Sequence, residues 1–323
     1  MSAFREGGRF PDGSSLGVAI GLVALPFVLP SVTLASEVVV FAVAALSCAL
    51  LLGLVGLLSF GQGLFFGIGA YASAILLREH AFGTLAALSV AALAAGLLAG
   101  LLAMVAVRRQ GVYFVMLTLA FAQMGYFAML ALRDFTGGEN GLTGVPRPPL
   151  LAGIGELATP EAVYALLAVL GFLAFLIVQR IGASPFGSVL RAIRQNEARA
   201  EALGYDVRRF KVAAFALAGA IAGLAGAMHT VFLGFTPPNV IELEMSERLI
   251  IMAIIGGVGA PGGAFLGAAF FLLMADWLST LWPRWLMLIG FLLIAIVLFL
   301  RDGLWGGAAS WLKRLRARTT RHG

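Results

Sequence analysis

The chain has very little charge. Of its 323 residues only 12% are charged and 61% are hydrophobic, and the mean hydropathy is +0.99. Soluble domains carry about 25% charged residues, so this chain lacks the side chains needed to cover a water-exposed surface. The deficit excludes a soluble globular protein. It predicts an all-α polytopic membrane protein in which residues 1–323 form a single transmembrane domain.

Residues that carry chemistry are also scarce. The single cysteine, Cys48, lies in an apolar run and excludes an internal disulfide. No group of residues has metal-ligand spacing, and no nucleophile stands near a base. The sequence contains no Gly-Lys-Ser or Gly-Lys-Thr, which excludes nucleotide binding by a Walker A loop. We therefore expect no catalytic residue, no metal and no cofactor bound by this chain, and do not expect an enzyme.

What the chain does have is long apolar stretches, and we expect about 8–10 transmembrane helices from them, including short or broken segments. The third and eighth stretches are shorter than the roughly 20 residues of a full span. They are candidates for re-entrant or broken helices packed inside the protein. The ten stretches are 16–35, 38–58, 64–77, 84–107, 112–132, 161–181, 212–233, 248–260, 263–282 and 285–300.

The basic residues predict the orientation. If all ten stretches cross and the N-terminus is inside, all but five of the 22 lysines and arginines face the cytoplasm, as the positive-inside rule favours. Both termini are then cytoplasmic, 303–323 is a basic tail at the inner face, and the Gly- and Pro-rich segment 133–160 is an external loop. The five outside are Arg78, Arg133, Arg147, Arg248 and Arg284.

Residues 184–204 interrupt the apolar pattern with a short amphipathic helix. Ser184 and Pro185 are typical of a helix start and Gly204 of a helix end. It is too short and polar to span. Such a helix either lies on the bilayer or the protein's own spans, or couples to a cytoplasmic motor by entering its groove. The residues expected to contact the motor are Pro185, Gly187, Ala192, Ile193, Asn196, Ala200, Leu203 and Gly204.

Two glycine-rich elements, 52–71 and 256–267, stand out among the spans. Glycine at membrane depth permits either close helix crossing or a helix break that exposes backbone dipoles to a substrate. Isolated polar residues in spans are candidates for function, although His229 and Asp276 can also reach the membrane interface. The residues expected to line a translocation pathway are Ser59, Gln62, Gly63, Gly67, Gln123, Gly256, Gly257 and Gly259.

Three segments together resemble a known family. The glycine-rich segment 53–71, the external segment Phe135-Thr-Gly-Gly-Glu-Asn-Gly-Leu-Thr-Gly-Val-Pro146, and the segment 184–204 followed by Lys211 are similar to motifs of branched-chain amino acid ABC importer permeases, specifically of the LivM-type subunit. The stretch 256–267 also fits. The resemblance covers roughly residues 38–300, and the order of the motifs is more specific than any one of them.

The resemblance implies a permease subunit of an ABC importer in the bacterial inner membrane. Its partners would be a LivH-type permease, two cytoplasmic ATPases that bind ATP and Mg²⁺, and a soluble periplasmic substrate-binding protein. Leucine, isoleucine and valine are the typical substrates, although related permeases carry other amino acids, amides or urea. The alternatives are a stand-alone secondary transporter or channel for small polar solutes, and a membrane scaffold. The near absence of ionisable pairs within the spans argues against an ion-coupled carrier.

Overall fold

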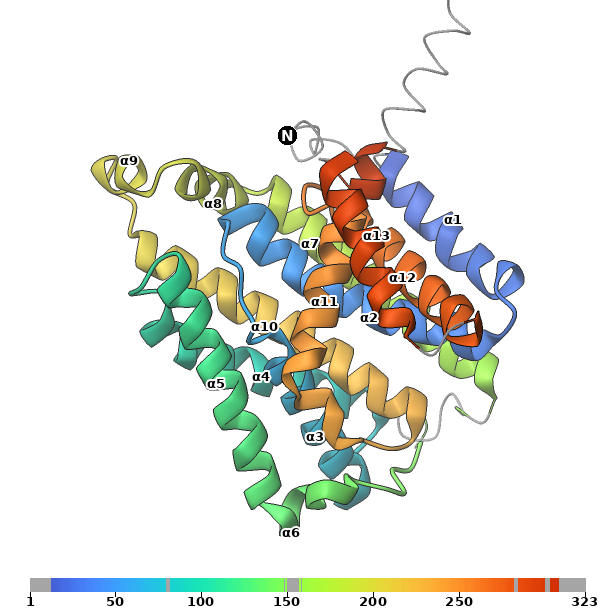
Figure 1. The fold of residues 1–323 in the computed structure, drawn as a ribbon. Coiled ribbons are helices and arrows are strands. Elements are labelled where there is room, and N and C mark those ends of the chain that lie inside the picture. Colours follow the sequence, from blue (N-terminus) through green and yellow to red (C-terminus); the bar gives the residue numbers. More distant parts are fainter. Residues whose placement is uncertain are drawn as a thin grey trace, which may run out of the picture.

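The computed structural model describes residues 13–79, 82–147, 149, 157, 159–281, 284–299 and 303–307, and these form a bundle of α-helices (Figure 1). We name the two ends of the bundle after α8 and α6, which lie at opposite ends (Figure 1). The helices and short helical turns are α1 Gly13–Val28, α2 Val32–Leu50, η1 Leu51–Val55, α3 Gln62–Glu79, α4 Thr84–Ala106, α5 Val112–Ala131, α6 Arg133–Thr136, η2 Gly138–Asn140, α7 Pro160–Ala183, α8 Pro185–Gln195, α9 Glu197–Ala202, α10 Val207–Leu233, η3 Pro238–Ile241, α11 Leu243–Gly256, α12 Pro261–Leu281 and α13 Trp285–Phe299.

Among the residues that the structure describes, six helical stretches are long and apolar enough to cross a membrane, which confirms an all-α polytopic membrane protein. They are Val32–Val55, Thr84–Ala106, Val112–Ala131, Pro160–Ala183, Val207–Leu233 and Pro261–Thr280. The predicted first stretch, 16–35, is wrong at its end, because α1 stops at Val28 and α2 begins at Val32. The Ser31 side chain caps α2 by accepting a hydrogen bond from Leu34 N at 3.1 Å, which fixes the new start.

The two short stretches are helices entered through segments that turn back into the bundle. At the α8 end, Gly56 adopts a φ of 79°, ends η1, and sends 56–61 back inward to the start of α3. At the α6 end, Gly234 adopts a φ of 66° after α10, and 235–242 returns to the start of α11. The positive φ favours glycine at both turns. The two units therefore have the same order of helix, returning segment and shorter helix, in opposite directions (Figure 1).

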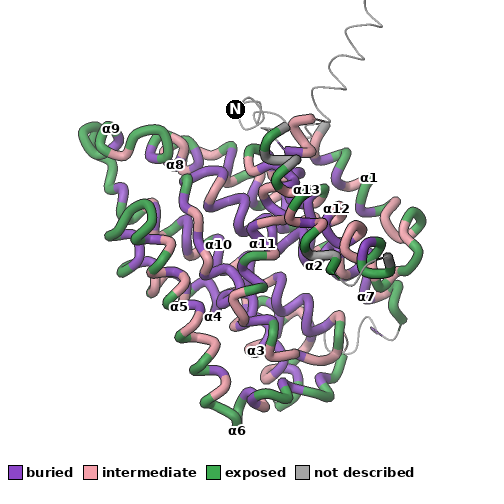
Figure 2. The backbone as a smooth tube through the Cα atoms, in the orientation of Figure 1, coloured by how far each residue is buried: buried purple, intermediate pink, exposed green. Residues whose placement is uncertain are grey.

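Glycine and alanine bring α10 into close contact with α3 and α4 at the centre of the bundle. A Cβ at Gly226 would lie 1.8 Å from Phe66 O, and one at Gly69 would lie 2.0 Å from Gly223 O. On the α4 side, a Cβ at Gly219 would lie 2.2 Å from the Ala99 Cβ. Such small residues let helix backbones approach closely in a membrane. Buried positions accordingly follow α2, α3 and α10 through the middle of the bundle (Figure 2).

The described part of the predicted loop 133–160 is largely non-helical but folded onto the bundle. It contains the short turns α6 and η2, and Leu142 forms an antiparallel bridge with Thr236. Arg147 Nε donates to Val231 O at 2.9 Å, at the end of α10. Residues 148, 150–156 and 158 of this loop, and 308–323 of the predicted basic tail, lie outside the described residues.

Candidate functional site

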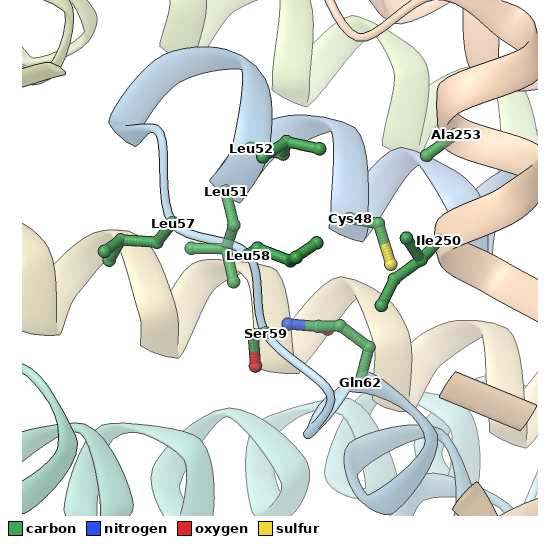
Figure 3. Close-up of a pocket in the computed structure, with 9 residues that line it drawn as sticks. All are labelled: Cys48, Leu51, Leu52, Leu57, Leu58, Ser59, Gln62, Ile250 and Ala253. Atoms are coloured by element: carbon green, nitrogen blue, oxygen red, sulfur yellow. The ribbon is translucent and has the colours of Figure 1, made fainter. Parts of the chain in front are cut away.

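A small cavity lies where the returning segment 56–61 meets the start of α3 (Figure 3). Its volume is about 10 Å³, close to the minimum needed by a single water molecule. The cavity is too small for an amino acid, so the bundle is closed at this point. Its lining residues are Cys48, Leu51, Leu52, Leu57, Leu58, Ser59, Gln62, Ile250 and Ala253.

The returning segment is fastened by hydroxyl groups from two distant helices. Ser246 Oγ on α11 donates to Phe60 O at 2.6 Å and accepts from Gly63 N at 2.9 Å. Thr118 Oγ1 on α5 accepts from Phe60 N at 3.2 Å. These bonds satisfy backbone groups that a helix would otherwise pair internally, as membrane depth requires. The sequence reasoning missed both residues, because a single hydroxyl in an apolar helix has no local signal.

Gln62 is a buried polar residue of the cavity wall whose amide nitrogen is unpaired within the described residues. Its side chain is 1% exposed and lies beside Ser59 in the cavity (Figure 3). Ser47 Oγ is 3.1 Å from Gln62 Oε1 and 2.6 Å from Ala44 O, so its one proton is shared between two acceptors. Gln62 Nε2 has no acceptor within the described residues. A buried amide with unused hydrogen-bonding capacity is suited to meet a polar group that enters the cavity.

The other predicted pathway residues are not gathered at the cavity. Gly67 packs on η3, where a Cβ would lie 2.7 Å from the Ile241 Cβ. Gly256 packs on α12, since a Cβ there would lie 1.9 Å from Gly263 O, and Gly257 turns the chain with a φ of 102°. Gln123 is half-buried on α5 and Gly259 is exposed. Their place in a pathway stays a prediction, whereas the structure brings Ser59 and Gln62 together, with Gly63 next to them.

The prediction of one helix over 184–204 is wrong, because the structure has two helices there. Asn196 is extended, with φ −162° and ψ 106°, and it separates α8 from α9. Its Oδ1 accepts from Arg199 N at 2.9 Å and so caps α9. Asparagine favours this capping role because its side chain competes with the helical backbone for hydrogen bonds. The apolar residues keep helical spacing across 196, so the sequence pattern does not predict the break.

The residues predicted to contact the motor fall into a buried and an exposed set. Gly187, Ile193 and Ala200 are buried against the protein's own chain. The others are exposed, so the pair of helices both packs on the bundle and presents an outer surface (Figure 2). The exposed set is Pro185, Ala192, Asn196, Leu203 and Gly204.

Charged side chains outside the set predicted to contact the motor fasten α8 and α9 to the bundle. Arg194 Nη1 on α8 donates to Gly53 O in η1. Lys211 Nζ on α10 lies 2.6 Å from Glu197 Oε2 at the start of α9. The Lys211 side chain is only 4% exposed, so this ion pair is largely removed from water. Movement of either short helix is therefore linked to specific points of the bundle.

Comparisons with known proteins agree along nearly the whole chain. The profile of a family described as "Branched-chain amino acid transport system / permease component" matches residues 31–298. The high-affinity branched-chain amino acid transport system permease protein LivM of Escherichia coli (strain K12) is 26% identical over 323 residues, covering 91% of this chain and 76% of that protein. The LivM protein of Salmonella typhimurium is 25% identical with the same coverage.

A relative that matches over a shorter stretch is named for a different import system. The autoinducer 2 import system permease protein LsrC of Klebsiella pneumoniae is 35% identical over 107 residues, which are 31% of each chain. No solved structure matches the chain significantly. Since the family profile extends from the end of the α1–α2 turn into α13, the chain belongs to the family of branched-chain amino acid transport system permease components.

Proposed function

We propose that this chain is the LivM-type transmembrane subunit of an ABC importer that moves branched-chain or related amino acids across the bacterial inner membrane. The observation that carries the proposal is the likeness to two LivM proteins over 91% of the chain. The closed cavity beside Gln62 supports it, because a gated permease needs a state in which the pathway is shut. Substrate contact would then require the returning segment 56–61 to move.

We further propose that the partners are a LivH-type permease, two cytoplasmic ATPases and a soluble periplasmic binding protein. The exposed residues of α8 and α9 form a surface at one end of the bundle on which an ATPase would dock. ATP and Mg²⁺ would be held by the ATPases and not by this chain. The stand-alone carrier differs in one observable respect, since it would transport in proteoliposomes without ATPases.

The α8 end is proposed to face the cytoplasm. We expect a cysteine at Arg199, which is exposed on α9, to react with a membrane-impermeant thiol reagent only from the cytoplasmic side. A cysteine at Glu139, exposed at the α6 end, should react only from outside. The native Cys48 is 5% exposed, and replacing it with serine removes any background labelling of this thiol. Labelling of Arg199→Cys from outside would mean that the α8 end faces away from the cytoplasm.

Affinity purification of the tagged protein in mild detergent, followed by mass spectrometry, tests the partners. We expect two ATPases and a second permease to be recovered with the parental chain. Ala192→Glu should lower recovery of the ATPases by about tenfold or more, because it buries an unpaired charge in the proposed contact. Gln110→Glu, which makes the same charge change at an exposed position between α4 and α5, outside the proposed contact, is the matched control.

Two results would contradict this proposal. Recovery of the chain alone, stable and able to transport by itself, would favour the stand-alone carrier. Normal ATPase recovery with Ala192→Glu would remove this face of α8 from the contact. The variant Ala200→Glu is unsuitable for the same purpose, because Ala200 is 2% exposed within its own chain and a glutamate there would disturb α9 directly.

A further inference from the structure

One side chain of the short helix α8, Arg194, contacts the chain between two groups of cavity-lining residues. Arg194 Nη1 donates to Gly53 O, and the Arg194 Cγ lies so close to Gly56 that a Cβ there would be 2.9 Å away. Gly53 and Gly56 mark the end of the helix formed by α2 and η1. The residues that immediately follow, 57–59 and Gln62, line the cavity. Leu51 and Leu52, just before Gly53, line it as well, so Arg194 holds the chain between two parts of the cavity wall.

The acceptor of this contact has a physical reason to bind an arginine. Carbonyl groups in the last turn of a helix lack internal partners and lie at the negative end of the helix dipole. A guanidinium satisfies such a carbonyl with a charge-assisted hydrogen bond, which is stronger than a neutral one. On its other side η1 meets the turn after α11, where a Cβ at Gly53 would lie 2.3 Å from Val258 O. The end of η1 is therefore held between α8 and this turn.

The two ends of the returning segment are attached to different parts of the molecule. Gly56, at its start, lies against Arg194 of α8. Phe60, near its other end, is fixed by Ser246 of α11 and Thr118 of α5. A displacement of α8 relative to α5 and α11 would therefore act on the residues between the two attachments. These include Leu57, Leu58 and Ser59 of the cavity wall.

We propose that Arg194 is a positioning residue that transmits displacement of α8 to the cavity by moving η1 and the returning segment. This inference rests on the proposed function, in which an ATPase displaces α8. The helices α7 and α10, which flank the α8–α9 segment along the chain, would move in any case. Arg194 adds a direct connection from α8 to the chain between two parts of the cavity wall, and its loss should leave ATPase binding intact while uncoupling the cavity from the nucleotide.

The single cysteine provides the measurement, since Cys48 lines the cavity and is buried. The complex with its ATPases is reconstituted in nanodiscs, and labelling of Cys48 by a small maleimide is followed by mass spectrometry of its peptide. The rates are compared without nucleotide and after trapping with ATP and vanadate. In the parental complex we expect nucleotide to change the labelling rate by about tenfold. In Arg194→Ala this dependence should disappear, with uptake per ATP hydrolysed falling by about tenfold.

Arg191→Ala is the matched control. Arg191 is also an arginine of α8 bonded to a helix-terminal carbonyl, but its partners, Gly182 O and Ser188 Oγ, belong to the joint between α7 and α8. It should keep the nucleotide dependence of Cys48 labelling. If Arg194→Ala does not fold, Arg194→Gln takes its place with the same expectation. Glutamine keeps a polar end group but lacks the charge and the reach of arginine.

The outcomes separate the inference from the function on which it rests. Loss of nucleotide dependence in the Arg194 variant, with ATPases still bound, supports the link. The link is overturned if Cys48 labelling in the Arg194 variant depends on nucleotide as in the parental complex, or if Arg191→Ala loses this dependence equally. Either result leaves the importer assignment unchanged. A parental complex that recovers no ATPase overturns the proposed function together with the inference, whereas one that keeps its ATPases but whose Cys48 labelling ignores nucleotide overturns the inference alone.

Discussion

Replacing Gly226 with alanine is expected to prevent stable assembly of the bundle. The added Cβ would lie 1.8 Å from Phe66 O and 3.0 Å from Ala70 N, and both are backbone atoms of α3. Backbone atoms inside a helix cannot turn aside as a flexible side chain can, so α3 and α10 would have to separate. Overpacking of this kind costs about 3 kcal/mol or more. We expect a large fall in the yield of monodisperse protein in detergent and in the temperature at which it aggregates.

Gly100→Ala is the control for this prediction. Gly100 lies on α4, and a Cβ there would be 3.4 Å from the Ala216 Cβ, which is an ordinary contact. Since alanine also has the higher helix propensity, the stability should change by less than about 1 kcal/mol. Unchanged aggregation temperature in Gly226→Ala would mean that the close crossing of α3 and α10 is wrong.

Variants of a predicted pathway glycine can lose uptake because of helix packing alone. Gly256 approaches Gly263 as closely as Gly226 approaches Phe66, with a Cβ distance of 1.9 Å. Loss of uptake in Gly256→Val would therefore follow from separation of α11 and α12 whether or not a substrate passes nearby. A polar replacement at the cavity, such as Gln62→Glu, tests the pathway without this difficulty of close helix packing.

The second large effect is expected when one partner of the Glu197–Lys211 ion pair is removed. Glu197→Leu leaves the Lys211 ammonium, 4% exposed, without its carboxylate, and such a change costs about 3–5 kcal/mol. Lys211→Met should cost less, about 1–3 kcal/mol, because the Glu197 side chain is 29% exposed and can be hydrated. The loss should appear as local release of α9, measured by hydrogen exchange across 196–206 or by the rate of tryptic cleavage at Arg199.

The double variant Glu197→Leu/Lys211→Met completes the test. With both charges gone, no group is left buried and unpaired, so much of the stability lost in Glu197→Leu should return. Arg209→Ala serves as the control, because Arg209 pairs with Asp206 at 2.8 Å while its side chain is 88% exposed. Exposed pairs contribute little, about 0–1 kcal/mol. Equal hydrogen-exchange protection across 196–206 in Glu197→Leu and in the parental protein would mean that Lys211 does not hold α9.

The sequence alone predicted those features that depend on composition and on residues close in the chain. The shortage of charge and the ten apolar stretches predicted an all-α polytopic membrane protein, because lipid requires apolar helices with internally paired backbones. The shortness of 64–77 and 248–260 indicated two unusual elements, and the structure shows that both are entered through returning segments. The order of the glycine-rich and polar motifs indicated the family, which the match over residues 31–298 confirms.

Tertiary structure decided how the individual residues are used. Asn196 fits the apolar face of one long helix by spacing, yet its side chain caps a new helix instead. Ser246 and Thr118 acquire their role only because α11 and α5 reach a segment 186 and 58 residues away in the chain. Arg194 likewise meets Gly53 across 141 residues. Hydropathy and local spacing determine that a segment is helical and enters the membrane, whereas contacts between distant segments determine which polar groups meet, and therefore where the cavity lies.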